Sequence, residues 1–424
     1  MLAMLFQLEQ SQWLPEKTLR QRQMTQAGVL LQHALTTVPF YRHLLSTMDG
    51  RQINEALWHE LPILERETIQ VEFENLKSRA IPPEHGALNT LGSSGSTGRP
   101  VSVLGTAVTA CYWQVLSARE HLWHKRDFSG KLAAIRSKTE RGRAPRWGNW
   151  CQGLITGPGC SLSISEDIDV QLAWLVEENP DYLLTHPSNL MALARRSIER
   201  GIGIPNLKQV RTFGEMLRPD LRELCTTAWD VSLTDIYSAE EVGYIALQCP
   251  QGEHYHVQAE NLLVEILDEN NLPCKPGETG HVVVTTLHNF AMPLIRYRLR
   301  DLAVVGEPCI CGRGLPVLRR IVGRQRNMIR LPNGKQYWPS FPGSIWRQTV
   351  PQLQQFQLIQ HTPSLIEIRI ASSKPVTIEQ EQSLASILTK QLGYEFTFNF
   401  TYVRRIEPTP NGKFEDFISM ITTQ

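Results

Sequence analysis

The chain has 424 residues, of which 42% are hydrophobic and 20% charged, so it can bury a large core and should contain two or more folding units. Its 43 basic residues balance 42 acidic ones, which excludes a strong charge field for nucleic acid or an anionic membrane. No apolar run reaches the ~18–20 residues of a membrane span, and Met1–Phe6 lacks the basic lead and cleavage site of a secretory signal. The eight cysteines, without secretory context, indicate a reducing compartment, so we expect a cytoplasmic protein with no nucleic-acid or membrane partner.

The first half of the chain predicts an α/β fold. Apolar positions at helical spacing run from about residue 15 until Pro39–Tyr41 interrupts them, and a second helix is expected over 65–77. From about residue 130, short apolar runs alternate with amphipathic segments, which favours a substantial parallel sheet. The expected strands are Lys131–Ile135, Tyr182–Thr185 and Gln209–Phe213, and the expected helices are Leu190–Arg200, ending at Gly201, and Leu217–Ala228.

The second half changes character twice. After about residue 245 the runs are short and β-rich, with Gly/Pro turns between them, and after Gly323 strand and helix patterns mix in a small α+β tail. We therefore expect a large N-terminal α/β domain with a β-rich subregion (1–326) and a small mobile α+β domain (327–424). The expected elements are strands at Asn261–Leu267, His281–Thr286, Leu302–Val305, Phe356–Gln360, Leu365–Ile370 and Phe396–Val403, and a helix at 378–392.

A stretch rich in glycine and hydroxyl groups, Gly92–Gly98, is the strongest local signal. Glycines let the backbone approach a phosphate closely, while amides and hydroxyls donate hydrogen bonds to its oxygens. It is not a Walker loop, because the interval between the two glycines is one residue too long and no lysine follows. The alternative is a flexible Ser/Gly linker, although apolar runs at 88–91 and 101–104 flank the stretch.

This stretch resembles the phosphate-binding loop of the adenylate-forming superfamily, which includes acyl-CoA ligases, luciferases and peptide-synthetase adenylation domains. The likeness is closest to the phenylacetate-CoA ligase family. Arg211–Glu215 resembles the strand and turn that lie beside the adenine and the acyl pocket in that family. Asp235–Gly243 is similar to its tyrosine-glycine-x-threonine-glutamate-valine-glycine pattern. The match implies that Tyr237 stacks on adenine and that Glu241 helps to hold Mg²⁺, a hard cation suited to a carboxylate.

Three later motifs follow in the order of the same superfamily. Met292–Leu302 resembles the family segment that binds the ribose, and by this match Asp301 would accept hydrogen bonds from the ribose hydroxyls. Ile321–Arg324 resembles the segment whose arginine reaches the ribose and phosphate, which would be Arg324 here. Pro408–Lys413 resembles the loop that carries the catalytic lysine. The resemblance implies that Lys413 and Glu241 are catalytic and that ATP is bound by Ser93, Ser94, Gly95, Ser96, Thr97, Gly98, Gly214, Glu215, Tyr237, Ser238, Asp301 and Arg324.

Each of these residues also has a plainer interpretation. Tyr237 could be a core aromatic, Asp301 an ordinary salt-bridge partner and Lys413 a solvated lysine near the chain end. Five matches in the right order, from about residue 90 to 413, favour the ligase interpretation.

Four residues could form a metal site. Cys249, His254, Cys309 and Cys311 offer three thiolates and an imidazole, the ligands of a closed tetrahedral structural Zn²⁺ site. The spacing also allows His256 in place of His254, and the Cys-x-Cys-Gly turn occurs in relatives of phenylacetate-CoA ligase. The alternative is ordinary buried thiols with a surface histidine.

The resemblance implies a two-step reaction. A carboxylate attacks the α-phosphorus of ATP with Mg²⁺ present and pyrophosphate leaves; the C-terminal domain then turns about a hinge at Asn327, and an acceptor thiol takes the acyl group. Relatives often carry aspartate at this hinge position. The expected acceptor is coenzyme A, and an aromatic acid pocket is expected near Trp113, His186 and Phe213.

Two departures from the family pattern bear on this function. Leu299-Arg300 replaces threonine-glycine beside Asp301, and Ile329–Pro339 differs from the run that helps to build the thioester-forming face, so the acceptor could instead be an acyl carrier protein or an amine. The alternative to an enzyme is a catalytically inactive protein that only binds a nucleotide. A second copy of the chain is a further expected partner.

Overall fold

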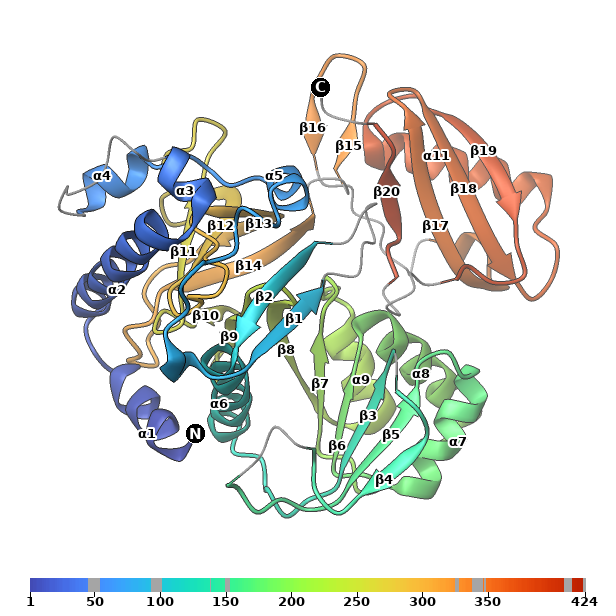
Figure 1. The fold of residues 1–424 in the computed structure, drawn as a ribbon. Helices are drawn as coiled ribbons and strands as arrows, with labels where there is room; N and C mark the ends of the chain where they lie inside the picture. The colour runs from blue at the N-terminus through green and yellow to red at the C-terminus, as the bar shows by residue number, and fades with distance from the viewer. Residues whose placement is uncertain are drawn as a thin grey trace. The chain divides into compact units, whose positions relative to one another are not determined.

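The protein is described by a computed structural model that covers residues 1–44, 54–92, 101–137, 139–148, 153–324, 328–337, 346, 348–407 and 414–421 (Figure 1). The chain forms two compact units, one made essentially of Met1–Ile321 and the other of the residues from Val322 onward. Within the described ranges, no helix has the length and apolar character needed to cross a membrane.

A twelve-stranded sheet forms the framework of the first unit. Strands β5, β3, β6, β7 and β8 run parallel to one another. In the rest of the sheet the pairs β8–β9, β9–β10, β10–β14, β13–β12 and β12–β11 are antiparallel. The predicted α/β class with a β-rich subregion is therefore confirmed. In sheet order the strands are β11 (Leu262–Leu267), β12 (Thr279–Thr286), β13 (Tyr297–Val305), β14 (Val317–Arg324), β10 (Tyr255–Val257), β9 (Gly243–Gln248), β8 (Ser232–Ala239), β7 (Gln209–Phe213), β6 (Tyr182–Thr185), β3 (Leu132–Arg136), β5 (Gly159–Ser163) and β4 (Gly142–Ala144).

Three amphipathic helices pack on one face of the parallel strands (Figure 1). Helices α7 (Ile168–Glu178), α8 (Pro187–Arg200) and α9 (Leu221–Trp229) share an apolar cluster with side chains of β3, β5, β6, β7 and β8. Helix α8 ends where the sequence predicted: Gly201 takes a left-handed φ of 61°, which glycine adopts without the steric cost of a side chain.

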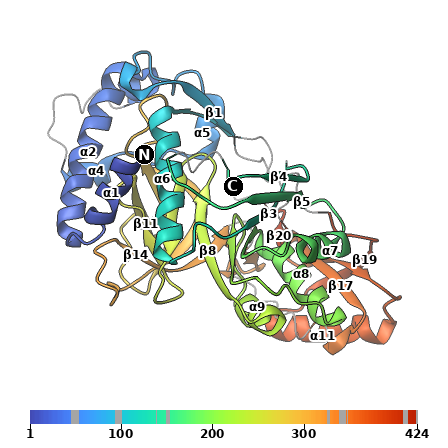
Figure 2. The same ribbon diagram turned by 90° about the horizontal axis from the view of Figure 1, so that it is seen from below.

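Helix α6 (Ala107–Trp123) packs against α1 (Leu2–Ser11) and β9, and Figure 2 shows it between the N-terminal helices and β8. Strand alternation sends Val210 into the helical cluster and Arg211 to the opposite face, where its Nε lies 2.9 Å from the Glu120 carboxylate of α6. Burial opposes ionisation of Glu120, yet the guanidinium groups of Arg126 and Arg211 hold its pKa well below the usual value. This buried cluster fixes α6 to the sheet, and removing one partner typically costs about 3–5 kcal/mol.

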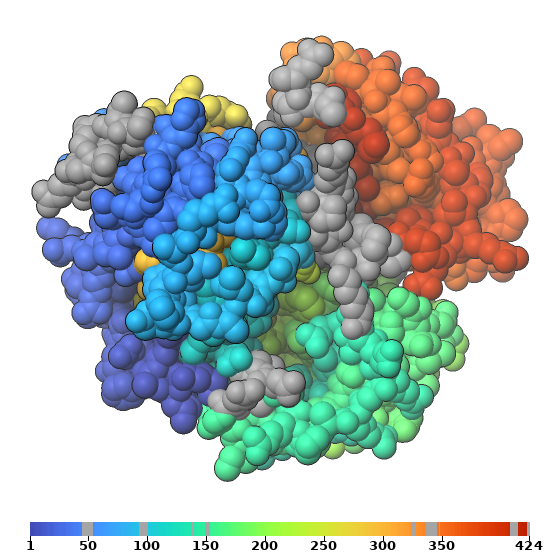
Figure 3. All heavy atoms as spheres, viewed as in Figure 1, coloured from blue at the N-terminus to red at the C-terminus, as the bar shows by residue number. Residues whose placement is uncertain are grey.

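The N-terminal helices lie on the outside of the first unit (Figure 3). Helix α2 ends at Thr37 because Val38, which precedes Pro39, is extended (φ −106°, ψ 112°), and a new helix starts at Pro39. The helix expected over 65–77 is shorter and ends at Val71. The remaining elements of this region are α2 (Glu16–Thr37), α3 (Pro39–Leu44), α4 (Glu55–Glu60), α5 (Arg66–Val71), a 3₁₀ turn at Pro83–His85, and the hairpin β1 (Leu88–Gly92) and β2 (Ser102–Thr106).

The second unit has its own α+β core. Its four-stranded sheet has the order β19-β18-β17-β20, and α11 covers it with Leu384, Leu388 and Leu392. Thr377 and Gln380 form a capping box at the start of α11. This agrees with the small α+β tail predicted from the sequence. The elements are β15 (Ile329–Arg330), β16 (Gln336–Tyr337), β17 (Leu353–Thr362), β18 (Leu365–Ser372), α11 (Ile378–Leu392), β19 (Thr397–Tyr402) and β20 (Phe417–Ser419).

Candidate active site

Several residues predicted for the site follow the carboxyl ends of adjacent parallel strands. His186 follows β6, Gly214 and Glu215 follow β7, and Glu241 lies two residues beyond β8. In open α/β sheets ligands bind at this edge, where loops from neighbouring strands converge. The predicted Ser93–Gly98 loop, Asn327, Lys413 and the side chain of Arg324 lie outside the described residues, so their roles stay predictions.

The turn after β7 is locked to the start of α8. Gly214 has φ 79°, a conformation that side chains disfavour, and it directs Glu215 back to the helix. The Glu215 carboxylate accepts hydrogen bonds from the backbone N–H and the hydroxyl of Ser188, at 2.9 and 3.0 Å. An anionic group is favoured at a helix N-terminus, so Glu215 already has a structural partner here.

Tyr237 and Asp301 come together from distant parts of the chain. The Tyr237 hydroxyl, on β8, donates to Asp301 Oδ2, on β13, at 2.8 Å. Tyr237 is 8% exposed, and Asp301 is half-buried. The contact fixes the orientation of the carboxylate, which can still accept a second hydrogen bond from a ligand.

Glu241 is held by two residues that the sequence did not indicate as functional. Arg66 Nη1 lies 3.6 Å from Glu241 Oε1, and the Tyr297 hydroxyl donates to the same oxygen at 3.3 Å. The side chains of Arg66 and Glu241 are only 12% and 8% exposed. Burial and the neighbouring Glu241 raise the pKa of Tyr297, which keeps its hydroxyl a hydrogen-bond donor.

The backbone explains why Arg66 reaches Glu241. Leu64 forms a bridge with Tyr297: its N–H donates to Arg296, and its carbonyl accepts from Arg298, at 2.9 and 3.0 Å. This pairing places Arg66, the first residue of α5, beside β13. The string Glu65-Arg66-Glu67 is typical of a solvated helix start, and no local signal in the sequence separates Arg66 from its neighbours.

The departure at Leu299-Arg300 has a structural explanation. Arg300 has φ 64°, a left-handed conformation that suits the glycine of the phenylacetate-CoA ligase pattern at this position. A non-glycine residue in this region costs about 1 kcal/mol or more. The Arg300 guanidinium pairs with Glu67 of α5, and Arg298 pairs with Glu65 at 2.9 Å, so ion pairs on both sides hold α5 to β13.

The predicted acyl-pocket residues form two aromatic pairs. The ring of Trp113, on α6, lies 4.8 Å from that of Tyr244, on β9, and Arg211 Nη2 donates to the Tyr244 hydroxyl at 3.3 Å. The rings of His186 and Phe213 lie 4.4 Å apart, and His186 Nδ1 is 3.0 Å from the Phe213 carbonyl oxygen. Trp113 is 39% exposed while His186 is only 2% exposed, so Trp113 is the better candidate for contact with a substrate.

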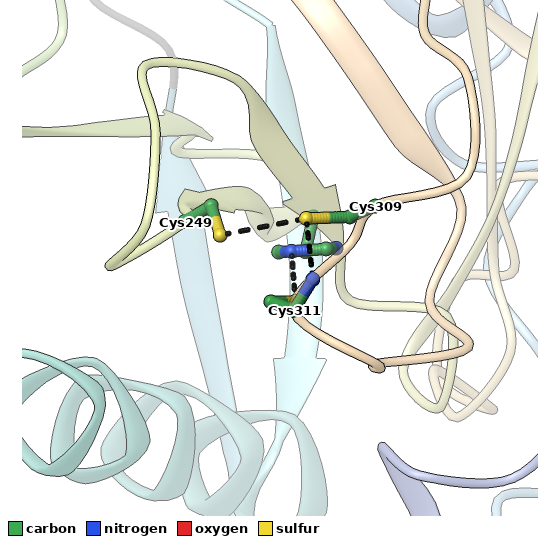
Figure 4. A group of neighbouring side chains, drawn as sticks. Cys249, Cys309 and Cys311 are labelled. Atoms are coloured by element: carbon green, nitrogen blue, oxygen red, sulfur yellow. Dashed lines mark hydrogen bonds between the residues drawn. The ribbon is translucent and has the colours of Figure 1, made fainter.

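The predicted metal ligands gather as well, with one change. Cys249, Cys309 and Cys311 place their sulfurs close to a histidine nitrogen, and the group that can hold an ion contains His256 rather than His254 (Figure 4). His254 remains adjacent, with Nε2 2.9 Å from Cys309 Sγ.

Comparisons with known proteins give matches over most of the chain. Residues 344–420 match the family model described as the CapK C-terminal domain. The phenylacetate-coenzyme A ligase of Thermus thermophilus is 24% identical over 392 residues, covering 88% of this chain and 86% of the relative. The phenylacetate-coenzyme A ligase of Escherichia coli (strain K12) is 25% identical over 330 residues, covering 73% and 72%.

Solved structures share the fold at lower identity. A 2-hydroxyisobutyryl-CoA ligase in the postadenylation state, in complex with R3-HIB-AMP, superposes with a TM-score of 0.76 at 16% identity, covering 97% of this chain and 91% of that one. The anthranilate CoA ligase AuaEII in complex with anthranoyl-AMP gives 0.53 at 16% identity, covering 76% and 65%. These likenesses establish the fold.

Proposed function

We propose that this chain is an adenylate-forming enzyme that activates a carboxylic acid with ATP and transfers the acyl group to coenzyme A, because its relatives matched over most of their length are phenylacetate-coenzyme A ligases and its fold is that of solved acyl-CoA ligases. The observation that carries the proposal is the Tyr237–Asp301 hydrogen bond beside the carboxyl ends of the parallel strands. It joins an aromatic ring suited to adenine with a carboxylate suited to the ribose hydroxyls.

In the first step a carboxylate oxygen of the acid bonds to the α-phosphorus of ATP, and the bond to pyrophosphate breaks. Negative charge builds on the phosphoryl oxygens, and preorganised donors there lower the barrier. We assign this stabilisation to the amides and hydroxyls of Ser93–Gly98 and to Lys413. Tyr237 and Asp301 would orient the nucleoside so that the α-phosphate meets the acid.

Glu241 fits the role of a magnesium ligand. Its carboxylate is a hard oxygen donor, nearly buried, and it lies at the same sheet edge as the β7 turn. Bound there, Mg²⁺ would neutralise phosphate charge. We also propose zinc as a second, structural metal, held by thiols outside the reacting groups.

In the second step the acceptor thiol bonds to the acyl carbon, and AMP leaves with one oxygen of the original acid. Coenzyme A is the acceptor we propose, because the relatives that this chain matches over 86% and 72% of their length are coenzyme A ligases. The departures in Ile329–Pro339 keep a carrier protein or an amine as the second candidate. The need for ATP and the eight cysteines fit a cytoplasmic enzyme.

An acid panel tests this function. We expect at least one aromatic or short-chain acid to support exchange of labelled pyrophosphate into ATP, and added coenzyme A to convert that acid into a thioester with AMP as co-product. A matched acceptor panel of coenzyme A, acyl carrier protein and amines identifies the second substrate. Pyrophosphate exchange without thioester formation would refute coenzyme A as the acceptor but would still support the adenylation step.

Arg66 should set how strongly the site requires magnesium. Its guanidinium pairs with the carboxylate that we assign to Mg²⁺, so the ion must compete with it. We expect Arg66→Gln to lower the free Mg²⁺ concentration for half-maximal exchange roughly tenfold, which corresponds to about 1.4 kcal/mol. Glu241→Gln should raise that concentration instead.

Arg298→Gln is the matched control for Arg66→Gln. It removes an ion pair between the same segment and β13 but does not touch Glu241. The magnesium requirement of this control should stay within about twofold of the wild type, as for a partly exposed ion pair. Equal magnesium curves for Arg66→Gln and the wild type would refute the competition.

A further inference from the structure

Four potential metal ligands from three segments of the sheet lie close together. Cys249 is the first residue after β9, His256 is the middle residue of β10, and Cys309 and Cys311 lie between β13 and β14. Strand β10 pairs with both β9 and β14, so the sheet itself brings these segments together. One ligand atom from each residue lies within 4.8 Å of all the others.

The separations match a tetrahedral ion. Cys249 Sγ and Cys309 Sγ are 3.8 Å apart, and Cys311 Sγ is 3.3 Å from His256 Nε2. Zn–S bonds of about 2.3 Å and Zn–N bonds of about 2.0–2.1 Å give tetrahedral edges of about 3.8 Å between sulfurs and about 3.5 Å between sulfur and nitrogen. A disulfide needs sulfurs about 2.05 Å apart, so the cluster does not have that geometry.

The surrounding donors suit thiolate ligands. The backbone N–H of Gln251 points to Cys249 Sγ, and that of Cys311 to Cys309 Sγ, both at 3.4 Å. His254 Nε2 lies 2.9 Å from Cys309 Sγ and can donate to it as an outer partner. Three thiolates around Zn²⁺ carry one net negative charge, which hydrogen bonds to the sulfurs would spread.

A nearby cation completes the charge balance. Arg313 follows Cys311 by two residues in the same turn and brings a positive charge to it. The guanidinium also lies over the rings of Trp123 and Trp13, at 4.4 and 4.8 Å, and donates to Gln12 at 2.7 Å. The turn that carries two of the cysteines is thereby tied to the N-terminal helices.

We propose that Cys249, His256, Cys309 and Cys311 form a closed, four-coordinate site for a structural Zn²⁺ ion, with His254 as an outer hydrogen-bond partner. All four coordination positions come from the protein, so the ion has no place for a substrate or a reactive water. Its role is to cross-link the β9–β10 turn to the β13–β14 connection. This proposal is independent of the ligase reaction.

Metal analysis of the full chain, purified without chelator or a histidine tag, tests the proposal. We expect about one zinc per chain, and chelation should lower the melting temperature. Replacement by Co²⁺ should give the visible absorption of a tetrahedral site together with thiolate-to-cobalt charge-transfer bands. Less than about one zinc for every two chains, or octahedral cobalt bands, would overturn the site.

Two histidine variants test the choice of ligand. His256→Ala should lose most of the zinc, whereas His254→Ala should retain about one per chain. Cys274→Ser, which alters a thiol outside the cluster, serves as a folding control. Zinc lost from His254→Ala and retained by His256→Ala would contradict the assignment. If His256→Ala fails to fold, the cobalt spectrum of the wild type and the zinc content of His254→Ala still decide between the ligands.

Discussion

Replacing Lys413 by alanine is expected to reduce acid-dependent pyrophosphate exchange by roughly 10²–10³-fold while leaving the circular dichroism spectrum and melting temperature unchanged. A lysine ammonium is a point charge on a flexible stem, suited to the phosphoryl oxygens as charge develops on them. Stabilising groups of this kind are typically worth about 3–4 kcal/mol of the barrier.

The control for this variant is Lys390→Ala, which removes an exposed lysine from α11. Its exchange rate should match the wild type. Transfer from preformed acyl-adenylate to coenzyme A should also survive in Lys413→Ala, because Lys413 is assigned to the first step alone. Near-normal exchange in Lys413→Ala would show that the C-terminal lysine is not catalytic.

Replacing Asp301 by alanine should weaken the binding of ATP and AMP by roughly 10–100-fold. A hydrogen bond to a charged group contributes about 1.5–3 kcal/mol, and Asp301 is assigned the ribose hydroxyls. Calorimetric titration with AMP measures the effect without turnover.

Tyr237→Phe is the matched variant for Asp301→Ala. It keeps the aromatic ring but removes the hydroxyl that donates to Asp301, so nucleotide affinity should fall less, by about threefold to tenfold for a loss of ~1 kcal/mol. An AMP affinity in Asp301→Ala equal to that of the wild type would refute the ribose assignment.

The sequence predicted the parallel part of the sheet well. Tyr182–Thr185 and Gln209–Phe213 are strands with the expected bounds, because each is a short run rich in aromatic, leucine or β-branched residues whose inner positions are largely buried. The helix before Gly201 also ends as expected. The helix predicted over 65–77 is only Arg66–Val71: Glu72 leaves the helical conformation (φ −95°, ψ 18°), and the Asn75 carbonyl beyond it accepts from the Phe40 N–H, a long-range contact that local periodicity does not report.

The contacts among the candidate site residues could not be predicted from the sequence. The motif order indicated Tyr237 and Asp301, and the structure brings them into contact. Nothing in the sequence links Arg66 to Glu241, since the pairing depends on how α5 docks on β13. The choice between His254 and His256 could not be made from spacing, because residues two apart point to the same face of an extended segment.

In the proposed first step an oxygen of the acid becomes bonded to the α-phosphorus of ATP. The most direct test uses acid labelled with oxygen-18 in both carboxylate positions, followed by mass spectrometry of the products after acyl transfer to coenzyme A. We expect AMP that carries one labelled oxygen, with unlabelled pyrophosphate. Labelled inorganic phosphate with ADP, or AMP without label, would contradict it.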